Sequence, residues 1–308
     1  MRIVISEFMD EAAVGSLARR FDVRYDGSLV DRRDELLAGL ADAHALIVRN
    51  RTQVDAALLE RAPKLRVVGR LGVGLDNIDV AACAARGIEV IPATGANAQA
   101  VAEYVVCTAM LLLRGAYLSS AEVAAGKWPR GALGEGRETA GKMLGVVGFG
   151  GIGRRVAKLA QGLGMKVLAT DPAIAADAPV WRESGAAFRG LDDLLAESDA
   201  VTLHVPLVPE TRHLLSAGRL ARMKRGAVLI NTARGGVIDE AALAEALAGG
   251  HLAGAALDVF ETEPLPAGSP LAGAPNLVLT PHVAGVTRES NARVSTLIAE
   301  KVAQALTK

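Results

Sequence analysis

Residues 143–171 constrain the fold of this chain more than any other stretch. An apolar run predicts a buried strand and leads directly into three glycines in the spacing G-x-G-x-x-G. Good helix formers with one apolar face follow, and then a second apolar run that ends at Asp171. In chain order the predicted parts are strand 143–147, the glycines Gly148, Gly150 and Gly153, helix 154–163 and strand 166–169.

This order of elements predicts a dinucleotide-binding site. The first glycine permits a tight turn, the second lets the backbone approach a pyrophosphate, and the third lets helix and strand pack closely. The N-terminus of the helix offers unpaired N–H groups and the positive end of the helix dipole to the phosphates. Gly151 and Ile152, which lie between the last two glycines of the motif, are further cofactor-binding candidates. Asp171 is expected to accept hydrogen bonds from an adenosine ribose and to repel a 2′-phosphate, which favours NAD over NADP.

The length of the chain, 308 residues, exceeds the usual size of one hydrophobic core and favours two domains. Short strand-like runs alternate with helical runs on both sides of the glycine segment, as in parallel sheets covered by helices. We therefore expect an α/β protein with two doubly wound parallel-sheet domains. A long helical pattern at 97–113 is expected to bridge them, and an amphipathic helix at 288–306 to pack back on the first domain. The expected boundaries are 1–96 plus 284–308 for one domain and 97–283 for the other.

The remaining elements are expected from apolar periodicity and from Asp residues at helix starts. Expected strands are residues 3–5, 23–25, 45–48, 66–69, 88–91, 200–205, 227–231, 254–257 and 277–279. Expected helices are residues 10–19, 31–40, 55–62, 79–85, 191–197, 217–223 and 239–247. Residues 115–141 lose this periodicity and gain glycines, which is typical of a functional segment or an interaction arm.

Charge and cysteine content exclude several classes of function. The formal net charge is zero, so neither nucleic acid nor an anionic membrane is expected as a partner. The longest apolar stretch, 105–113, is far shorter than a membrane span, and the N-terminal apolar run is too short for a signal peptide. Cys83 and Cys107 lie in apolar helical patterns and are expected to be buried thiols rather than a disulfide or metal ligands. We therefore expect a cytoplasmic protein without a metal site.

Two polar clusters, residues 49–52 and 70–74, directly follow predicted strands. Ligands of open α/β sheets bind beyond the carboxyl ends of the strands, so the arginines of both clusters are candidates to meet an anionic ligand. Backbone N–H groups exposed at the two glycines of the second cluster would assist them. The substrate-binding candidates are Arg49, Arg51, Arg70, Leu71, Gly72, Val73 and Gly74. In the structural alternative, the arginines are solvated or pair with Asp55, Asp76 or Asp79.

Three further stretches, 231–236, 258–264 and 280–285, put polar groups just after predicted strands of the second half. Together they supply an arginine, acidic residues and a histidine, which beside a nicotinamide form an apparatus for hydride transfer. Each residue also has an ordinary alternative: an aspartate that caps a helix, a glutamate in a turn before proline, or a structural histidine.

These motifs resemble the signatures of the D-isomer-specific 2-hydroxyacid dehydrogenase family. The matching stretches read VGFGGIG, NTARGGVID, LDVFETEP and LTPHVAG, and RLGVGLDNID resembles the substrate loop of the phosphoglycerate dehydrogenase branch. The resemblance implies a Rossmann cofactor domain inserted into a flavodoxin-like substrate domain. It also implies NAD as the cofactor and a homodimer.

The resemblance assigns roles by motif. Arg234 would hold the substrate carboxylate and keto oxygen, His282 would exchange a proton with the hydroxyl group, and Glu263 would pair with the other imidazole nitrogen. Asp258 would bind the nicotinamide carboxamide. The remaining cofactor-binding candidates are His204, for which a structural role is the alternative, Thr232 and Ala233.

The arginines of the first cluster bear on the substrate, because a second acidic group would need their positive charge. ISEFMDEAAV and IVRNRT resemble sulfolactate dehydrogenases within the family. We therefore expect a small 2-hydroxy or 2-oxo acid with a second anionic group, sulfolactate before 3-phosphoglycerate. A glyoxylate or hydroxypyruvate reductase and a non-catalytic NAD(H)-sensing dimer are the alternatives.

Overall fold

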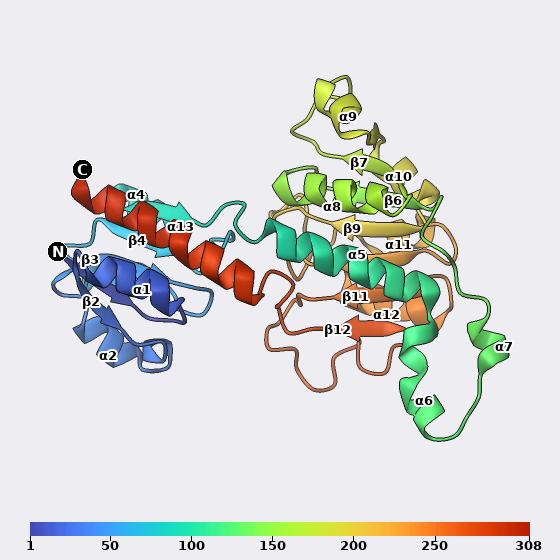
Figure 1. Cartoon of the computed structure of the whole chain (residues 1–308), viewed down its shortest axis with the longest axis horizontal. Coiled ribbons are helices and arrows are strands. Elements are labelled where there is room, and N and C mark those ends of the chain that lie inside the picture. Colours follow the sequence, from blue (N-terminus) through green and yellow to red (C-terminus); the bar gives the residue numbers. More distant parts are fainter. The chain divides into compact units, whose positions relative to one another are not determined.

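The computed structural model describes the backbone of residues 1–308 and all side chains except that of Leu118. Packing divides the chain into two units, Met1–Asn97 with Val286–Lys308 (unit 1) and Ala98–Gly285 (unit 2). Each unit contains its own parallel sheet with helices on both faces (Figure 1). The protein thus has the α/β class and the two doubly wound sheets that the sequence predicts.

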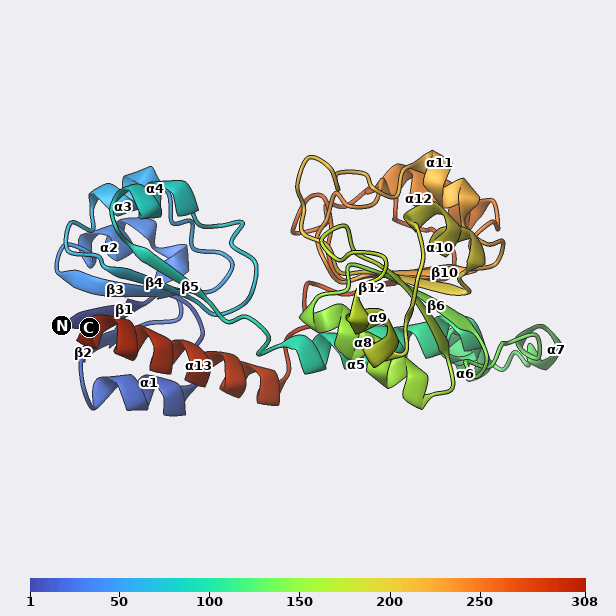
Figure 2. The same cartoon turned by 90° about the horizontal axis from the view of Figure 1, so that it is seen from above.

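Unit 1 contains a five-stranded parallel sheet in the order β2-β1-β3-β4-β5. Its strands are β1 (Arg2–Ile5), β2 (Asp22–Tyr25), β3 (Ala43–Val48), β4 (Val67–Arg70) and β5 (Glu89–Pro92). Helices α1 and α13 cover one face, and α2, α3 and α4 cover the other (Figure 2). These helices and a 3-10 turn are α1 (Glu11–Ala18), η1 (Leu29–Asp31), α2 (Arg33–Ala38), α3 (Ala56–Glu60), α4 (Val80–Ala85) and α13 (Arg288–Thr307).

Strand β4 and helix α13 show how closely the layers of unit 1 pack. A Cβ atom at Gly69 of β4 would lie 2.8 Å from side-chain atoms of both Ile298 and Val302 of α13. The helix begins where Thr287 accepts a hydrogen bond from the Ser290 N–H at 3.0 Å. Its apolar stripe then completes the core on the α1 side of the sheet.

Unit 2 contains a seven-stranded parallel sheet in the order β12-β11-β10-β9-β6-β7-β8. The strands are β6 (Met143–Val147), β7 (Lys166–Thr170), β8 (Ala187–Phe188), β9 (Ala200–Leu203), β10 (Val228–Asn231), β11 (Gly254–Leu257) and β12 (Leu277–Leu279). Helices α5 (Ala98–Arg114), α8 (Gly151–Gly162) and α9 (Pro179–Ser184) lie on one side of it. Helices α10 (Leu191–Glu197), α11 (Ala217–Arg222) and α12 (Glu240–Ala248) lie on the other side.

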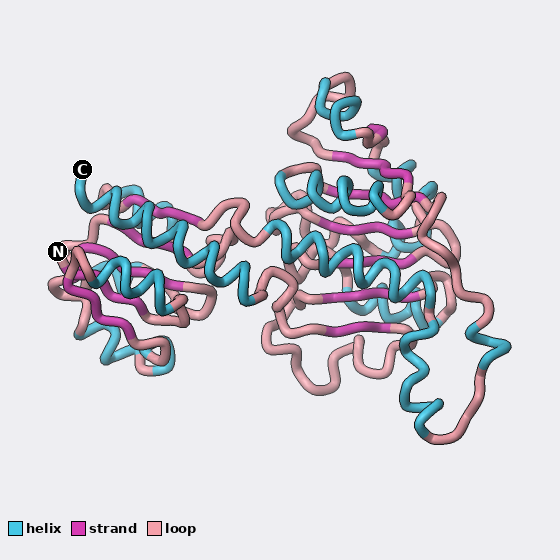
Figure 3. Tube along the Cα trace, viewed as in Figure 1, coloured by secondary structure: helices cyan, strands magenta, loops and turns pink.

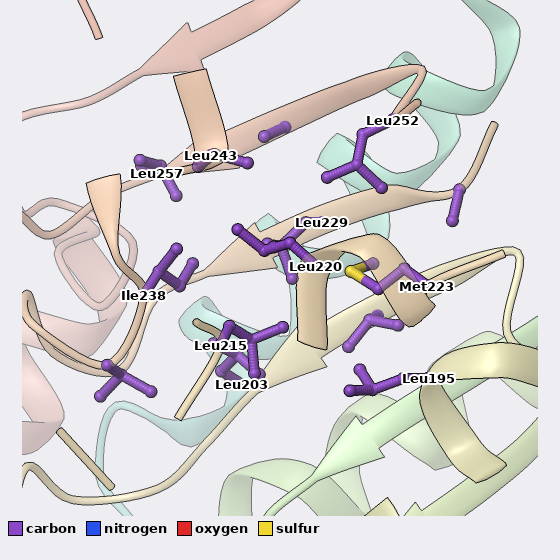
Figure 4. Packing of buried hydrophobic residues seen from close by; sticks show 14 of the residues in the cluster. Leu195, Leu203, Leu215, Leu220, Met223, Leu229, Ile238, Leu243, Leu252 and Leu257 are labelled. Carbon is purple, nitrogen blue, oxygen red and sulfur yellow. The ribbon is translucent and has the colours of Figure 1, made fainter. Parts of the chain in front are cut away.

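The core between the sheet and helices α10 to α12 follows from strand alternation. Leu203, Leu229 and Leu257 come from three neighbouring strands and point to the same face (Figure 4). They meet Leu220 of α11 and Leu243 of α12. Loops leave the carboxyl ends of these strands (Figure 3), and they contain the polar residues that follow each strand.

Two expectations from the sequence are wrong in unit 2: α9 and β8 lie where no element was expected, and Cys107 is not buried. Residues 115–141, expected to be a functional segment or an interaction arm, contain short helices. The short helices are η2 (Ala116–Ser119), α6 (Ser120–Ala124) and α7 (Arg130–Leu133). Elements of two to six residues are too short to show apolar periodicity. Cys83 is buried, but Cys107 is exposed. The expectation for Cys107 is wrong because α5 is apolar on nearly all sides, so its sequence pattern does not reveal which face is covered.

None of the helices in the described part of the chain has both the length and the apolar character that a membrane span requires.

Candidate active site

The glycine segment forms the strand, turn and helix that its spacing predicts. Gly148 follows β6 with a φ of +92°, and a Cβ there would lie 2.4 Å from the carbonyl oxygen of His204. A Cβ at Gly153 would lie 2.2 Å from the carbonyl oxygen of Gly148. Neither position therefore accepts a side chain without moving the backbone.

The next two glycines have open space around them, as a bound pyrophosphate requires. A Cβ at Gly150 or Gly151 would meet no atom within 4 Å. Helix α8 begins at Gly151 without a side-chain cap, so its first N–H groups receive no side-chain acceptor. A pyrophosphate supplies the negative charge that such a helix end attracts. The residues present therefore fit NAD.

Asp171, just after β7, fastens this turn. Its Oδ2 accepts a hydrogen bond from the Phe149 N–H at 2.8 Å, and its Oδ1 accepts one from the Ala173 N–H at 2.9 Å. The Asp171 carboxylate thus lies beside the glycine turn. The sequence predicts that this carboxylate binds the adenosine ribose.

The other cofactor candidates surround the ends of β9 and β10. His204 donates its N–H to Val147, and its Nε2 lies 3.0 Å from Thr202 Oγ1. Burial lowers the pKa of His204 to about 3, so the imidazole is neutral at physiological pH. Thr232 Oγ1 is buried and has no hydrogen-bond partner among the described atoms, which a bound cofactor would change. Ala233 is buried and its N–H donates to Asn231 Oδ1 at 3.0 Å.

The structure pairs the predicted catalytic histidine and glutamate directly. His282 Nδ1 lies 2.8 Å from Glu263 Oε2, and Glu263 Oε1 accepts a hydrogen bond from the Phe260 N–H at 3.1 Å. The side chains of His282 and Glu263 are 38% and 35% exposed. The hydrogen bond between Glu263 and Nδ1 therefore fixes the orientation of the imidazole ring and leaves Nε2 without that partner, so that Nε2 can exchange a proton.

Asp258 holds the loop that carries this histidine. The residue is 1% exposed, and its carboxylate accepts three hydrogen bonds, from the Thr280 hydroxyl at 2.6 Å and from the N–H groups of Val283 and Ala284 at 2.8 Å each. The Asp258 carbonyl also accepts the His282 N–H at 2.9 Å. This support matters because His282 has a φ of +57°, which is unfavourable for a residue with a side chain.

Arg234 follows β10 in a turn that touches the glutamate loop. The Asn231 side chain closes this turn, since its Nδ2 donates to the Arg234 carbonyl at 2.9 Å. A Cβ at Gly235 would lie 1.8 Å from the Phe260 carbonyl oxygen, so the two loops are in contact. Gly235 is not among the site residues predicted from the sequence, although its place in the motif NTARGG was the available signal. Unit 2 thus brings together the loops of Arg234, Glu263 and His282.

In unit 1, a buried glutamate organises residues 49–52. The Glu7 carboxylate accepts hydrogen bonds from all four N–H groups of this loop. Asn77 Nδ2 adds a hydrogen bond of 2.7 Å to the Thr52 carbonyl. Glu7 is not among the residues predicted from the sequence, and the available signal was an acidic residue two positions after an apolar strand.

The two arginines of this loop have different surroundings. Arg51 forms an exposed ion pair with Asp31, which is none of the three partners weighed from the sequence. Arg49 donates to Asn291 Oδ1 of α13 at 2.9 Å, and its guanidinium lies 5.8 Å from the centre of the Phe8 ring. Burial lowers the pKa of Arg49, although the Glu7 carboxylate opposes this change.

Two N–H groups of the loop of residues 70–74 form hydrogen bonds to backbone carbonyls of unit 1. The N–H groups of Leu71 and Gly72 donate to the carbonyls of Val48 and Arg70, each at 2.8 Å. The expectation that Gly72 exposes its N–H is therefore wrong, because the chain turns tightly after β4. Among the hydrogen bonds of the described residues, none uses the N–H of Val73 or Gly74.

Comparisons with known proteins agree with this geometry. A family model described as the NAD-binding domain of D-isomer specific 2-hydroxyacid dehydrogenases matches residues 106–284. The chain is 57% identical to (S)-sulfolactate dehydrogenase of Chromohalobacter salexigens over 304 residues, which cover 99% of this chain and 98% of that protein. It is 41% identical to D-3-phosphoglycerate dehydrogenase of Mycobacterium bovis over 305 residues, which cover 99% of this chain and 56% of that protein.

A solved structure has the same fold over the whole chain. The TT0316 protein of Thermus thermophilus matches with a TM-score of 0.90 and 36% identity, over 100% of this chain and 97% of that one. Together with the relative that is similar over nearly its full length, this match establishes the family. The chain belongs to the D-isomer-specific 2-hydroxyacid dehydrogenases and is an NAD-dependent enzyme of that family.

Proposed function

We propose that the enzyme interconverts a small 2-hydroxy acid and its 2-oxo acid, and that the substrate carries a second anionic group. Sulfolactate with sulfopyruvate is the first pair to test, and 3-phosphoglycerate with its oxo acid is the second. The observation that carries the catalytic part is the pairing of His282 with Glu263, beside the loop that holds Arg234.

Each catalytic residue has a role that follows from its chemistry. Arg234 binds the carboxylate and the C2 oxygen through its planar donor fork. In oxidation, His282 Nε2 takes the proton of the C2 hydroxyl, while the C2 hydrogen leaves as hydride and the carbonyl forms. Glu263 keeps the imidazole in the tautomer that accepts at Nε2 and stabilises the imidazolium that results. When bound, NAD accepts the hydride in this direction, and NADH supplies it in the other.

The cofactor contacts are assigned from the glycine turn, the start of α8 and the buried polar atoms near the ends of β9 and β10. We assign the pyrophosphate to Gly150, Gly151 and Ile152 at the start of α8, where Gly148 and Gly153 shape the turn. Asp171 is assigned to the adenosine ribose. We assign His204, Thr232, Ala233 and Asp258 to the nicotinamide side of the cofactor, and the buried, unpartnered Thr232 Oγ1 supports this.

Unit 1 supplies the groups for a second anion. Arg49, Arg51 and Arg70 are the candidates to bind it, while the N–H groups of Val73 and Gly74 are assigned to the substrate carboxylate. The name of the similar Chromohalobacter protein, sulfolactate dehydrogenase, favours a sulfonate as that group.

The test is NADH oxidation by purified protein with four oxo acids: sulfopyruvate, 3-phosphohydroxypyruvate, hydroxypyruvate and glyoxylate, with NADPH as the control. We expect kcat/KM to be at least about tenfold higher for a doubly anionic acid, the effect of one additional charge-assisted contact. Equal and slow turnover of all four would refute the second-anion assignment. Binding of NADH with no turnover of any of them would favour a sensor.

We also propose a cytoplasmic homodimer. The segment after α5 exposes large apolar side chains, Tyr117 at 66% and Trp128 at 78%, which a second copy of the chain would cover. Light scattering after size exclusion should give the mass of a dimer. It should give a monomer for Trp128→Ser if this segment forms the interface.

A further inference from the structure

The loop of residues 49–52 already binds an anion, the carboxylate of Glu7. This side chain belongs to a residue only 4% exposed, and its oxygens accept the N–H groups of residues 49, 50, 51 and 52 at 2.8, 3.3, 3.1 and 3.0 Å. Consecutive N–H groups that converge on one point form an anion-binding nest. Because Glu7 fills this nest, only the side chains of the loop remain for a second anionic group of the substrate.

Those side chains offer less positive charge than the motif IVRNRT indicates. The Arg51 guanidinium is paired with the Asp31 carboxylate. The Arg49 guanidinium contacts Asn291 and the Phe8 ring. The Glu7 carboxylate acts on it electrostatically, but no ion pair is found between Arg49 and a carboxylate of the described side chains. Arg49 is therefore the cation that this loop presents.

The loop of residues 70–74 adds no further positive charge to the loop of residues 49–52. Arg70 is the last residue of β4, and its guanidinium lies over Gly72. If Gly72 had a Cβ atom, that atom would lie only 1.4 Å from Arg70 Nη1. Its charge therefore lies against residues 70–74, the loop assigned to the substrate carboxylate.

We propose that Glu7 and Asp31 determine the substrate preference of this enzyme. Glu7 fills the backbone nest and Asp31 pairs with Arg51, so Arg49 alone remains to bind the second anionic group, which favours a sulfonate over a phosphate. This inference rests on the proposed function and narrows its substrate class. A phosphate monoester carries about 1.5 to 2 negative charges at pH 7, whereas a sulfonate carries a single one. Both groups are tetrahedral with three terminal oxygens, so charge rather than shape distinguishes them.

The decisive variant is Asp31→Asn, which releases Arg51 from its ion pair without disturbing the core, since both side chains are more than half exposed. We expect the ratio of kcat/KM for 3-phosphohydroxypyruvate to that for sulfopyruvate to rise about three- to tenfold, as one added charge acts more strongly on the more charged group. Asp34→Asn is the matched control, an exposed aspartate three residues away, and should leave the ratio unchanged.

A second variant tests the nest itself. Glu7→Gln offers one acceptor oxygen, and its amide group faces N–H donors, so the loop must rearrange. We expect KM for sulfopyruvate to rise at least about tenfold, as when a buried donor loses its acceptor, while KM for NADH changes less than about twofold.

The outcomes separate this inference from the function on which it rests. If the wild-type enzyme reduces neither doubly anionic acid, the proposed function and the inference both fail. If it reduces sulfopyruvate but Asp31→Asn leaves the ratio at its wild-type value, the inference alone fails. A wild-type preference for 3-phosphohydroxypyruvate over sulfopyruvate would overturn it as well.

Discussion

Replacing Asp258 by asparagine should slow catalysis by loosening the loop that carries His282. The carboxylate accepts the Thr280 hydroxyl and two backbone N–H groups, at 2.6 to 2.8 Å. An asparagine oxygen can keep two of these hydrogen bonds, but the amide group then faces the third donor. One buried donor without an acceptor costs about 1 to 3 kcal/mol, and loss of the charge weakens each remaining hydrogen bond by about 1 kcal/mol.

These terms sum to a local cost of about 3 to 5 kcal/mol, which corresponds to a loss of kcat/KM of at least roughly a hundredfold, because the loop relaxes when its hydrogen bonds are lost. The assay is steady-state NADH oxidation with the best oxo acid, with thermal unfolding to verify that the variant is folded. Asp177→Asn, an exposed aspartate after β7, is the control. A folded Asp258→Asn enzyme with kcat/KM within about twofold of wild type would refute the clamp. A higher KM for NADH with unchanged kcat would instead support direct contact with the carboxamide.

Three other changes test other parts of the structure. His282→Ala should lower kcat at neutral pH by about a hundredfold or more while NADH binding measured by fluorescence persists, and near-normal turnover would contradict the proton-exchange role. Arg49→Ala should raise KM for sulfopyruvate at least about tenfold but change KM for glyoxylate little, and equal increases for both acids would contradict its assignment to the second anion. Because burial lowers the pKa of His204 from 6.5 to about 3, the unfolded chain binds a proton there below pH 6.5 that the folded chain excludes. The contribution of His204 to the free energy of unfolding should therefore be complete above pH 6.5 and fall by about 1.4 kcal/mol per pH unit between pH 6.5 and about 3. Urea unfolding of His204→Gln should show a shallower decline over this range, and equal slopes would contradict this.

Local sequence signals predicted the scaffold because each element obeys a local rule. The strand, turn and helix at 143–162 follow from the glycine spacing, and the structure begins α8 at Gly151. Aspartates expected at helix starts do cap them: Asp55 and Asp79 each accept an N–H of the first turn at 2.9 Å. The pairing of Glu263 with His282 was also predictable, but only through the resemblance, since 19 positions separate the two residues.

Features that depend on contacts between distant segments were not predictable in this way. Glu7 accepts hydrogen bonds from residues more than forty positions away. Arg51 pairs with Asp31, which lies 20 positions earlier in the turn before α2. The tight turn that consumes the Gly72 N–H depends on how β4 ends. A sequence pattern shows that such groups are polar, but only the folded chain shows which other polar group satisfies them.

The core of unit 1 between its sheet and α1 draws on both ends of the chain. Ile3, Ile5 and Val67 share that core with Ile298 and Val302 of α13. During synthesis on the ribosome, the residues of unit 2 are all complete before α13 emerges, so the unit with the glycine turn can fold first. Until α13 is synthesised, one apolar face of the N-terminal strands has no helix of the C-terminal end of the chain to cover it. We therefore expect chaperones to bind that face of the nascent chain.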